Sequence, residues 1–127
     1  MKKIKLDAGL ETVAIGSGQL RFNPGDPNLY IRFQEAVEKL QAVEAELVAK
    51  ADTGEKLPNL LGQADAKMKE ILGWVFGPGN DFDKILEGVN LLAVAANGER
   101  VVTNLFAALE PILEEGARRC ARNLAGK

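Results

Sequence analysis

Apolar side chains alternate with polar or small ones in the first part of the chain. The alternating apolar pairs are Ile4 and Leu6, Val13 and Ile15, and Leu20 and Phe22. A period of two predicts β-strands, because successive side chains of a strand point to opposite faces. Gly16-Ser17-Gly18 lies between the last two pairs and suits a tight turn, so residues 12–22 are predicted to form a hairpin. Because a lone hairpin is only marginally stable, this ribbon must pack on something or pair with another strand.

After residue 26 the apolar spacing changes to alternating steps of four and three. Asp26 is a candidate N-cap, and Pro27 suits the first helical position. The apolar residues that recur on one side are Leu29, Phe33, Ala36, Leu40, Val43 and Leu47. This spacing predicts a helix over residues 27–51, roughly 37 Å long at about 1.5 Å per residue. Such a helix is longer than a small domain needs, so part of its stripe is expected to serve a neighbouring chain.

The remainder of the chain is predicted to be helical, with glycine, asparagine and proline residues marking where helices start and end. The predicted segments are a helix opened by Pro58 and closed at Gly77-Pro78-Gly79, a short helix capped by Asn80 or Asp81 and ended by Gly88, a short helix over residues 90–96, and a last helix from Glu99 onward that Pro111 kinks. The expected fold is mostly α (α+β), with an N-terminal β-hairpin followed by a bundle of about four to five helices. Residues 1–127 are expected to form a single domain, with the ribbon in residues 1–25 and the helical part in residues 26–125.

Composition and charge favour a cytoplasmic protein that binds other proteins. Apolar residues make up 46% of the 127 positions, and 16 basic against 18 acidic side chains leave a net charge of −2. A charge this small provides no field to attract nucleic acid or a membrane surface, and no apolar run approaches the roughly 20 residues that span a bilayer. Cys120 is the one cysteine, so no internal disulfide is expected, and because the first residues do not have the pattern of a secretory leader, a cytosolic protein is expected.

Candidate chemistry is sparse, and we expect no enzyme activity, no cofactor and no metal site. Histidine is absent, which removes the usual proton-transfer group and metal ligand and leaves Cys120 without an activating base. Gly77-Pro78-Gly79-Asn80-Asp81 lacks the ending of a phosphate-binding loop and is read as a helix stop. Asn80, Asp81 and Asp83 resemble the start of a calcium loop, but the glycine and glutamate that complete such a loop do not follow. Glutamate pairs such as Glu114 and Glu115 are read as solvated surface.

Partner-binding candidates come from the apolar stripes and from the basic end of the last helix. The candidates are Leu29, Phe33, Leu40, Leu47, Trp74, Phe76, Arg118, Arg119 and Arg122. For the aromatic residues the simplest reading is the core, and any that is exposed becomes the first interface candidate. For the arginines, together with Lys127, the helix macrodipole is a sufficient explanation, and docking to an acidic patch on a partner is the functional alternative.

The order of these segments resembles the small tail assembly chaperones of long-tailed bacteriophages and prophages. The likeness rests on three stretches: Phe22-Asn23-Pro24-Gly25-Asp26-Pro27-Asn28-Leu29-Tyr30, Val75-Phe76-Gly77-Pro78-Gly79-Asn80-Asp81 and Leu86-Glu87-Gly88-Val89-Asn90. The resemblance implies a non-enzymatic protein that binds the tape measure protein and brings tail tube subunits to it. It further implies that the protein works in the host cell cytoplasm during assembly and does not enter the mature virion. The family has no catalytic residues to carry over.

Two features of the sequence agree with such a role. Long amphipathic helices with acidic outer faces provide soluble apolar grooves for a helical client, and the free edges of the ribbon allow strand pairing between subunits. We therefore predict a homo-oligomer, such as a ring or an open spiral. The alternatives are a structural component of the phage particle and a small regulatory module. The regulatory module would use the basic C-terminal turns to bind nucleic acid.

Overall fold

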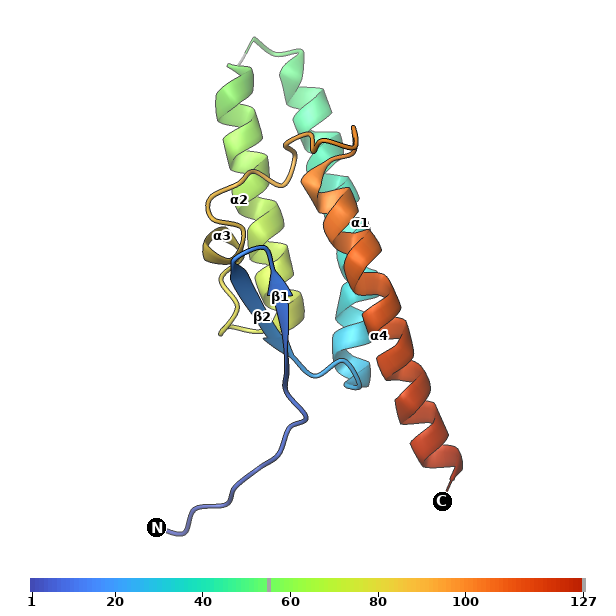
Figure 1. The fold of residues 1–127 in the computed structure, drawn as a ribbon. Coiled ribbons are helices and arrows are strands. Elements are labelled where there is room, and N and C mark those ends of the chain that lie inside the picture. The colour runs from blue at the N-terminus through green and yellow to red at the C-terminus, as the bar shows by residue number, and fades with distance from the viewer. Residues whose placement is uncertain (55, 127) are drawn as a thin grey trace.

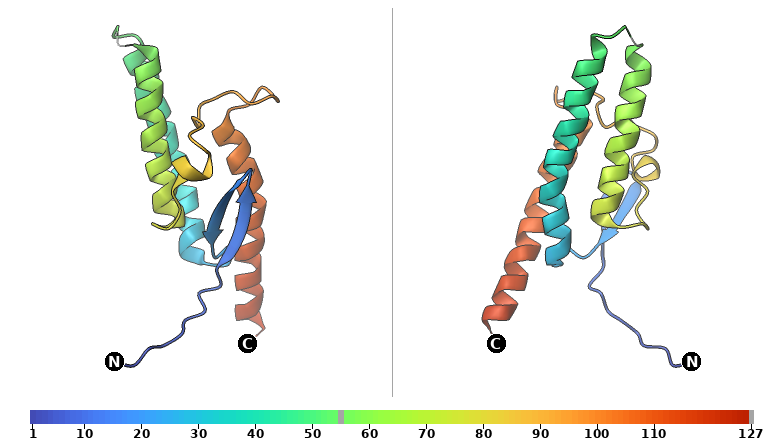
Figure 2. Two further views of the ribbon diagram at one scale, coloured as in Figure 1. Left: turned by 60° about the vertical axis from the view of Figure 1, so that its left-hand side comes forward. Right: turned by 180° about the vertical axis from the view of Figure 1, so that it is seen from behind.

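A computed structural model describes residues 1–54 and 56–126, and it contains one β-hairpin and four helices in these ranges. The hairpin consists of β1 (Glu11–Ile15) and β2 (Gly18–Phe22), and the helices are α1 (Pro27–Ala51), α2 (Leu57–Phe76), α3 (Phe82–Ile85) and α4 (Val101–Ala125). α1 and α2 form an antiparallel pair, α4 packs against α1, and the hairpin and α3 lie between α2 and α4 (Figures 1 and 2). The predicted α+β class, with a hairpin before a helical bundle, is confirmed.

The hairpin has the predicted position, and a two-residue turn joins its strands. β1 and β2 pair antiparallel with Val13 opposite Leu20 and Ile15 opposite Gly18. Gly16 has a φ angle of +58°, which is the left-handed conformation that a tight turn needs. The Ser17 hydroxyl donates to the Glu87 carboxylate, which ties the turn to the loop after α3.

The prediction of a strand at Ile4 and Leu6 is wrong for a single copy of the chain. Residues 1–10 form no regular structure, and the side chains of Ile4 and Leu6 are 90% and 85% exposed. Alternation alone cannot hold a strand, because a strand needs the hydrogen bonds of a neighbour. These residues leave the hairpin as an extended segment that stands clear of the body of the protein (Figure 1); we call residues 1–10 the arm.

The two long helices that follow agree with the predictions. α1 begins at Pro27, where the Asp26 carboxylate accepts a hydrogen bond from the Asn28 N–H at 3.0 Å. α2 ends at Gly77, whose φ angle of +102° is open to glycine and strained for other residues. α1 and α2 pack along their lengths and bury Ala36 and Leu72 completely. None of the helices in the described part of the chain is both long enough and apolar enough to span a membrane.

The chain between α3 and α4 differs from the prediction of a short helix over residues 90–96. α3 starts at Asp81 as expected, because its carboxylate accepts from the N–H groups of Asp83 and Lys84. Residues 90–96 instead form turns, and Val94 bridges to Arg100. The turn at Gly98, with φ of +83°, brings the Ala95 N–H to the Glu99 carbonyl at 2.7 Å. That pairing uses backbone groups that a helix would need, so the segment folds back as a loop.

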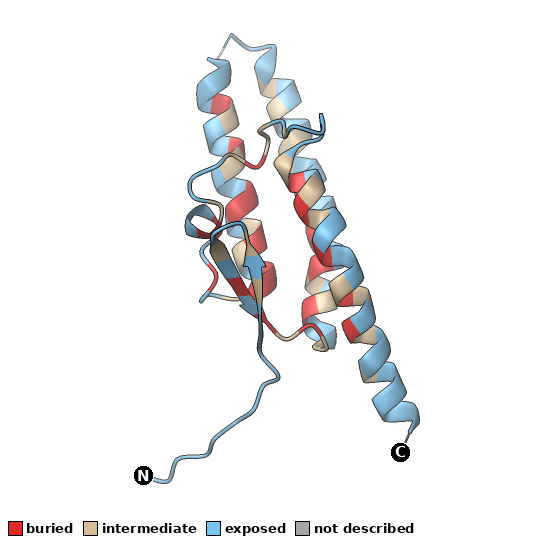
Figure 3. Ribbon diagram, in the orientation of Figure 1, coloured by how far each residue is buried: buried red, intermediate tan, exposed pale blue. Residues whose placement is uncertain are grey.

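α4 begins two residues later than predicted and continues through Pro111 to Ala125. Its last turns extend beyond the other helices and are exposed (Figures 1 and 3). The buried residues gather where the hairpin, α3 and the inner sides of α1, α2 and α4 meet (Figure 3). Aromatic side chains connect these elements. The rings of Phe22 and Phe76 meet edge-on with their centroids 5.1 Å apart, and the rings of Phe33 and Phe106 stack with their centroids 4.7 Å apart.

Candidate partner-binding surface

The first candidate surface is a groove of about 470 Å³ between α1 and α4, here called the α1–α4 groove. Its lining residues are Val37, Leu40, Gln41, Glu44, Arg100, Val102, Thr103, Phe106, Ala107 and Glu110. Val37 is 40% exposed, whereas Phe106 is half-buried and stacks on Phe33 of the core. Charged residues belong to the lining, with the Arg100 guanidinium 2.6 Å from the Glu44 carboxylate. An apolar floor with polar groups around it is the usual make-up of a site that receives an amphipathic helix.

The second candidate surface is a groove of about 340 Å³ between β1 and α4, here called the β1–α4 groove. Its lining residues are Val13, Ala14, Ile15, Leu86, Val101, Asn104, Leu105, Ala108, Leu109 and Ile112. Asn104 is the one polar side chain among them. Three consecutive residues of β1 contribute, although their side chains alternate between the two faces of the ribbon. The groove therefore follows the edge of β1.

The two edges of the hairpin differ in how their backbone groups are satisfied. With a two-residue turn, Ile15 and Gly18 form a hydrogen-bonded pair, so the N–H and C=O of Thr12, Ala14, Gln19 and Arg21 point outward. At β2, the Asn80 side chain closes the edge: it accepts from the Arg21 N–H at 2.9 Å and donates to the Arg21 carbonyl at 2.8 Å. At β1, no described residue hydrogen-bonds the outward N–H and C=O groups of Thr12 or Ala14. The open edge of the ribbon is the one that borders the β1–α4 groove.

Four of the predicted partner-binding residues lie in the core of the single chain. Leu29, Phe33, Leu40 and Phe76 are only 3–7% exposed. α2, α4 and the hairpin cover the first half of α1. The apolar residues of α1 in this half therefore pack inside the same chain. These residues therefore hold the fold together, and a partner reaches Leu40 only at the floor of the α1–α4 groove.

Leu47 and Trp74 keep contact with solvent, as a partner-binding role requires. Leu47 is half-buried between the upper parts of α1 and α2. Trp74 is 44% exposed, and the Lys39 ammonium lies 5.0 Å from the centre of its ring. This distance allows a cation–π interaction, which holds the indole against the outer side of the α1–α2 pair. Among the aromatic candidates, Trp74 is the exposed one and is therefore the first aromatic candidate for an interface.

The predicted basic cluster is compensated by acidic side chains. Glu115 lies 2.9 Å from Arg122 and 3.1 Å from Arg118, and Glu11 of β1 lies 3.5 Å from Arg119. Hydrogen bonds from Arg122 and then Arg118 lower the pKa of Glu115, so this carboxylate stays charged at neutral pH. Pairing of this kind weakens the field that the arginines present to a polyanion. Lys127, the fourth member of the cluster, lies outside the described residues.

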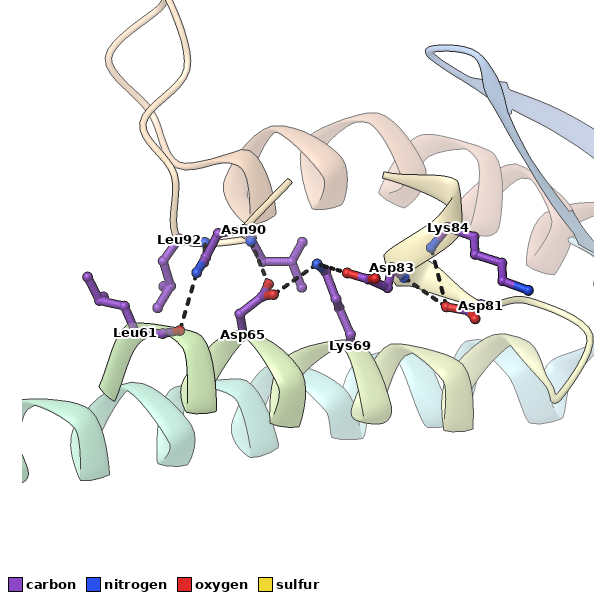
Figure 4. Close-up of polar contacts among 9 residues, drawn as sticks. Leu61, Asp65, Lys69, Asp81, Asp83, Lys84, Asn90 and Leu92 are labelled. Atoms are coloured by element: carbon purple, nitrogen blue, oxygen red, sulfur yellow. Dashed lines mark hydrogen bonds and ion pairs between the residues drawn. The ribbon is translucent and has the colours of Figure 1, made fainter. Parts of the chain in front are cut away.

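Acidic residues that superficially resemble a metal or catalytic site have structural partners. The buried Lys69 ammonium lies 2.8 Å from the Asp65 carboxylate and 2.7 Å from that of Asp83, which joins α2 to α3 (Figure 4). The second oxygen of Asp65 accepts from the Leu91 N–H at 2.8 Å and holds the loop before α4. Burial lowers the pKa of Lys69, but the two carboxylates raise it by more, so it stays above its ordinary value. In residues 1–54 and 56–126, no cluster of three metal-ligating side chains is found.

Sequence reasoning missed that α4 offers apolar residues on two sides. Val102 and Phe106 face α1, whereas Val101, Leu105, Ala108 and Ile112 line the groove beside β1. The wide apolar arc of residues 101–113 could have indicated two contact sides, because a helix that packs against one neighbour needs only a narrow apolar stripe. Which part of the arc stays open depends on how far α4 stands from the hairpin, and no local pattern encodes that distance.

The fold and its surfaces define a small α+β protein with open apolar grooves on both sides of its last helix. No family model, curated protein or solved structure matches the chain.

Proposed function

We propose that this protein is a non-enzymatic tail assembly chaperone of a long-tailed bacteriophage or prophage. In this role it binds the tape measure protein in the host cytoplasm, helps recruit tail tube subunits and does not remain in the mature virion. The observation that supports the proposal most is the α1–α4 groove. It has the length of about two helical turns on each side, since its lining runs from Val37 to Glu44 on α1 and from Val102 to Glu110 on α4.

The chemistry of the groove suits a long helical client. A helix that lays its apolar side on Val37, Phe106 and Ala107 removes apolar area from water, which is the main source of affinity in such complexes. Gln41, Thr103 and Glu110 around the floor can hydrogen-bond the polar side of the same helix. A client of this kind aggregates when its apolar stripe is exposed, so a groove that covers the stripe keeps the client soluble until the tail tube forms around it.

The direct test is co-expression of the protein with a fragment of the tape measure protein. We expect the wild type to keep the fragment soluble and Val37→Asp to weaken binding at least about tenfold, because a carboxylate in an apolar groove costs more than the about 1.4 kcal/mol that a tenfold change represents. Ile31→Asp is the matched control, since Ile31 is a 51% exposed residue of α1 outside the groove. Isothermal titration calorimetry gives the dissociation constants.

Several outcomes decide between this proposal and its alternatives. Equal loss of binding in both variants, or no binding by the wild type, would contradict the proposal. Detection of the protein in purified virions would favour a structural component of the particle. Retention on DNA at low salt, where phosphate contacts are strongest, would favour the regulatory module.

A further inference from the structure

The arm carries an apolar pair that its own chain leaves uncovered. Ile4 and Leu6 are separated by one residue, so they lie on the same side of an extended segment, and Lys3, Lys5 and Asp7 occupy the other side. Both apolar side chains are almost fully exposed. This alternation suits a strand that would bury Ile4 and Leu6 on one face once a neighbouring strand pairs with it.

The base of the arm is held so that the arm points away from its own β1–α4 groove. Asn23 donates to the Ala8 carbonyl at 2.9 Å, and the Gly9 N–H donates to the Asp7 carboxylate at 2.9 Å. Gly9 has a φ angle of +68°, and a Cβ at this position would lie 2.9 Å from the Asn23 amide. Leu10 then lies beside Gly77 and Asn80, on the β2 side of the ribbon. The arm leaves from that side in each of the views in Figures 1 and 2.

The β1–α4 groove has the features that an incoming strand requires. The outward N–H and C=O groups of Thr12 and Ala14 can hydrogen-bond a third strand, as in other cases of strand addition to a sheet edge. Val13 and Ile15 face the groove beside that edge, so the new strand would place alternate side chains among them and Ile112. A cavity of about 150 Å³ holds benzene, so a groove of about 340 Å³ has room for two aliphatic side chains.

Charge favours the pairing of an arm with another copy of the chain. The arm contains three lysines and one aspartate, which is a charge of +2. Because the whole chain carries −2, the remaining residues carry −4. Opposite charges on the arm and on the body of a second copy attract each other during encounter.

We infer that residues 2–7 of one copy add as a third strand to the free edge of β1 in a second copy, where Ile4 and Leu6 enter the β1–α4 groove. The occupant of this groove is thus a second copy of the chain, and the α1–α4 groove stays open for a client. The inference does not depend on the tape measure protein: failure to bind that client would leave the self-association intact, and failure of the self-association would leave the client groove intact.

Light scattering of the full chain tests the role of the arm. We expect the wild type to scatter as a multiple of the 13.7 kDa chain and the double variant Ile4→Asp/Leu6→Asp to scatter as a monomer with an unchanged circular dichroism spectrum. The matched control is Leu57→Asp/Val94→Asp, which adds the same charge at two exposed residues outside both grooves and should keep the wild-type mass. A monomeric wild type, or an arm variant that keeps the wild-type mass, would overturn the inference.

Cross-linking tests the place where the arm binds. Leu6→Cys and Ala108→Cys are combined in a chain that also carries Cys120→Ser, and a short bismaleimide is added. Ala108 is an exposed residue of the β1–α4 groove. We expect covalent dimers and larger species on a denaturing gel, and neither single-cysteine chain should give them at the same rate. Cross-linked product of monomer mass would mean that the arm folds onto its own groove, and absence of cross-linking would mean that it binds elsewhere. Either result would overturn the inference.

Discussion

Replacing Gly116 with alanine is expected to lower the free energy of unfolding by about 2 kcal/mol, because overpacking by a methyl group costs roughly 1–3 kcal/mol or more. Gly116 lies on the buried side of α4, where the helix crosses the turn before α1. A Cβ there would lie 1.8 Å from the Pro24 carbonyl oxygen and 2.9 Å from the Gly25 nitrogen. This turn is held by the Asn23 carboxamide, which accepts from the Gly25 N–H at 2.8 Å, so it cannot move aside cheaply.

The expected loss is large enough to measure despite the helix-forming advantage of alanine. Alanine is better than glycine inside a helix by roughly 0.5–1 kcal/mol, so the expected loss is the steric cost minus this gain. Urea unfolding followed by circular dichroism measures the change, which corresponds to a fall in Tm of roughly 8 °C for a domain of this size.

Gly62→Ala provides the matched control for Gly116→Ala. Gly62 lies inside α2, and nothing lies within 4 Å of the position its Cβ would take. The same substitution should therefore raise the stability by roughly 0.5–1 kcal/mol. If Gly116→Ala also raised the stability, α4 would not approach the turn before α1 as closely as described.

Lys69→Met is expected to lower the free energy of unfolding by about 2 kcal/mol, which is less than the roughly 3–5 kcal/mol for breaking a fully buried ion pair. Lys69 is 8% exposed, and its ammonium bridges Asp65 and Asp83. Asp83 is 68% exposed and can be hydrated after the change, which reduces the loss. Asp65 is 15% exposed. It keeps the hydrogen bond from the Leu91 N–H but loses the positive charge of the Lys69 ammonium. The loop before α4 and the start of α3 should loosen together, which hydrogen exchange would detect.

Lys67→Met is the matched control for the buried lysine. Lys67 lies on the same helix, is 50% exposed and pairs with Glu46 at 3.2 Å on the surface. Exposed ion pairs contribute roughly 0.2–1 kcal/mol, so this variant should lie within about 0.5 kcal/mol of the wild type. Equal effects of the two substitutions would show that the Lys69 cluster does not join α2 to the loop.

The stabilisation by Lys69 should also depend on pH in a defined way. Burial lowers the pKa of Lys69, and the carboxylates of Asp65 and Asp83 raise it by more, so the folded pKa exceeds the ordinary value of 10.5. A group whose pKa rises on folding contributes its full stabilisation below the unfolded pKa and loses it as the pH rises through the folded pKa. The difference in stability between the wild type and Lys69→Met should thus be constant from about pH 6 to 9 and shrink only above about pH 10.5.

Local residue chemistry was sufficient to predict most of the secondary structure. Gly16-Ser17-Gly18 between alternating pairs produced the hairpin, and Asp26-Pro27 set the start of α1, because turns and caps depend on a few neighbouring residues. The same reasoning failed at residues 90–96, where Asn90 looked like a helix cap. In the folded chain its side chain donates to the Leu61 carbonyl of α2, which is a contact between residues far apart in the sequence.

The role of each apolar residue was decided only by the tertiary structure. Periodicity identified Leu29, Phe33 and Leu40 as one stripe but cannot say whether the stripe meets its own chain or another one, and the fold buries all three. Asn80, from the loop before α3, closes the β2 edge and leaves the β1 edge as the open one, and Gly116 lets α4 pass close to the turn at Pro24. Most of the helices and the hairpin could be predicted from the sequence, since short-range sterics and hydrogen bonds define them. Which surfaces stay open was decided by packing between distant elements, because burial depends on the whole arrangement of the chain.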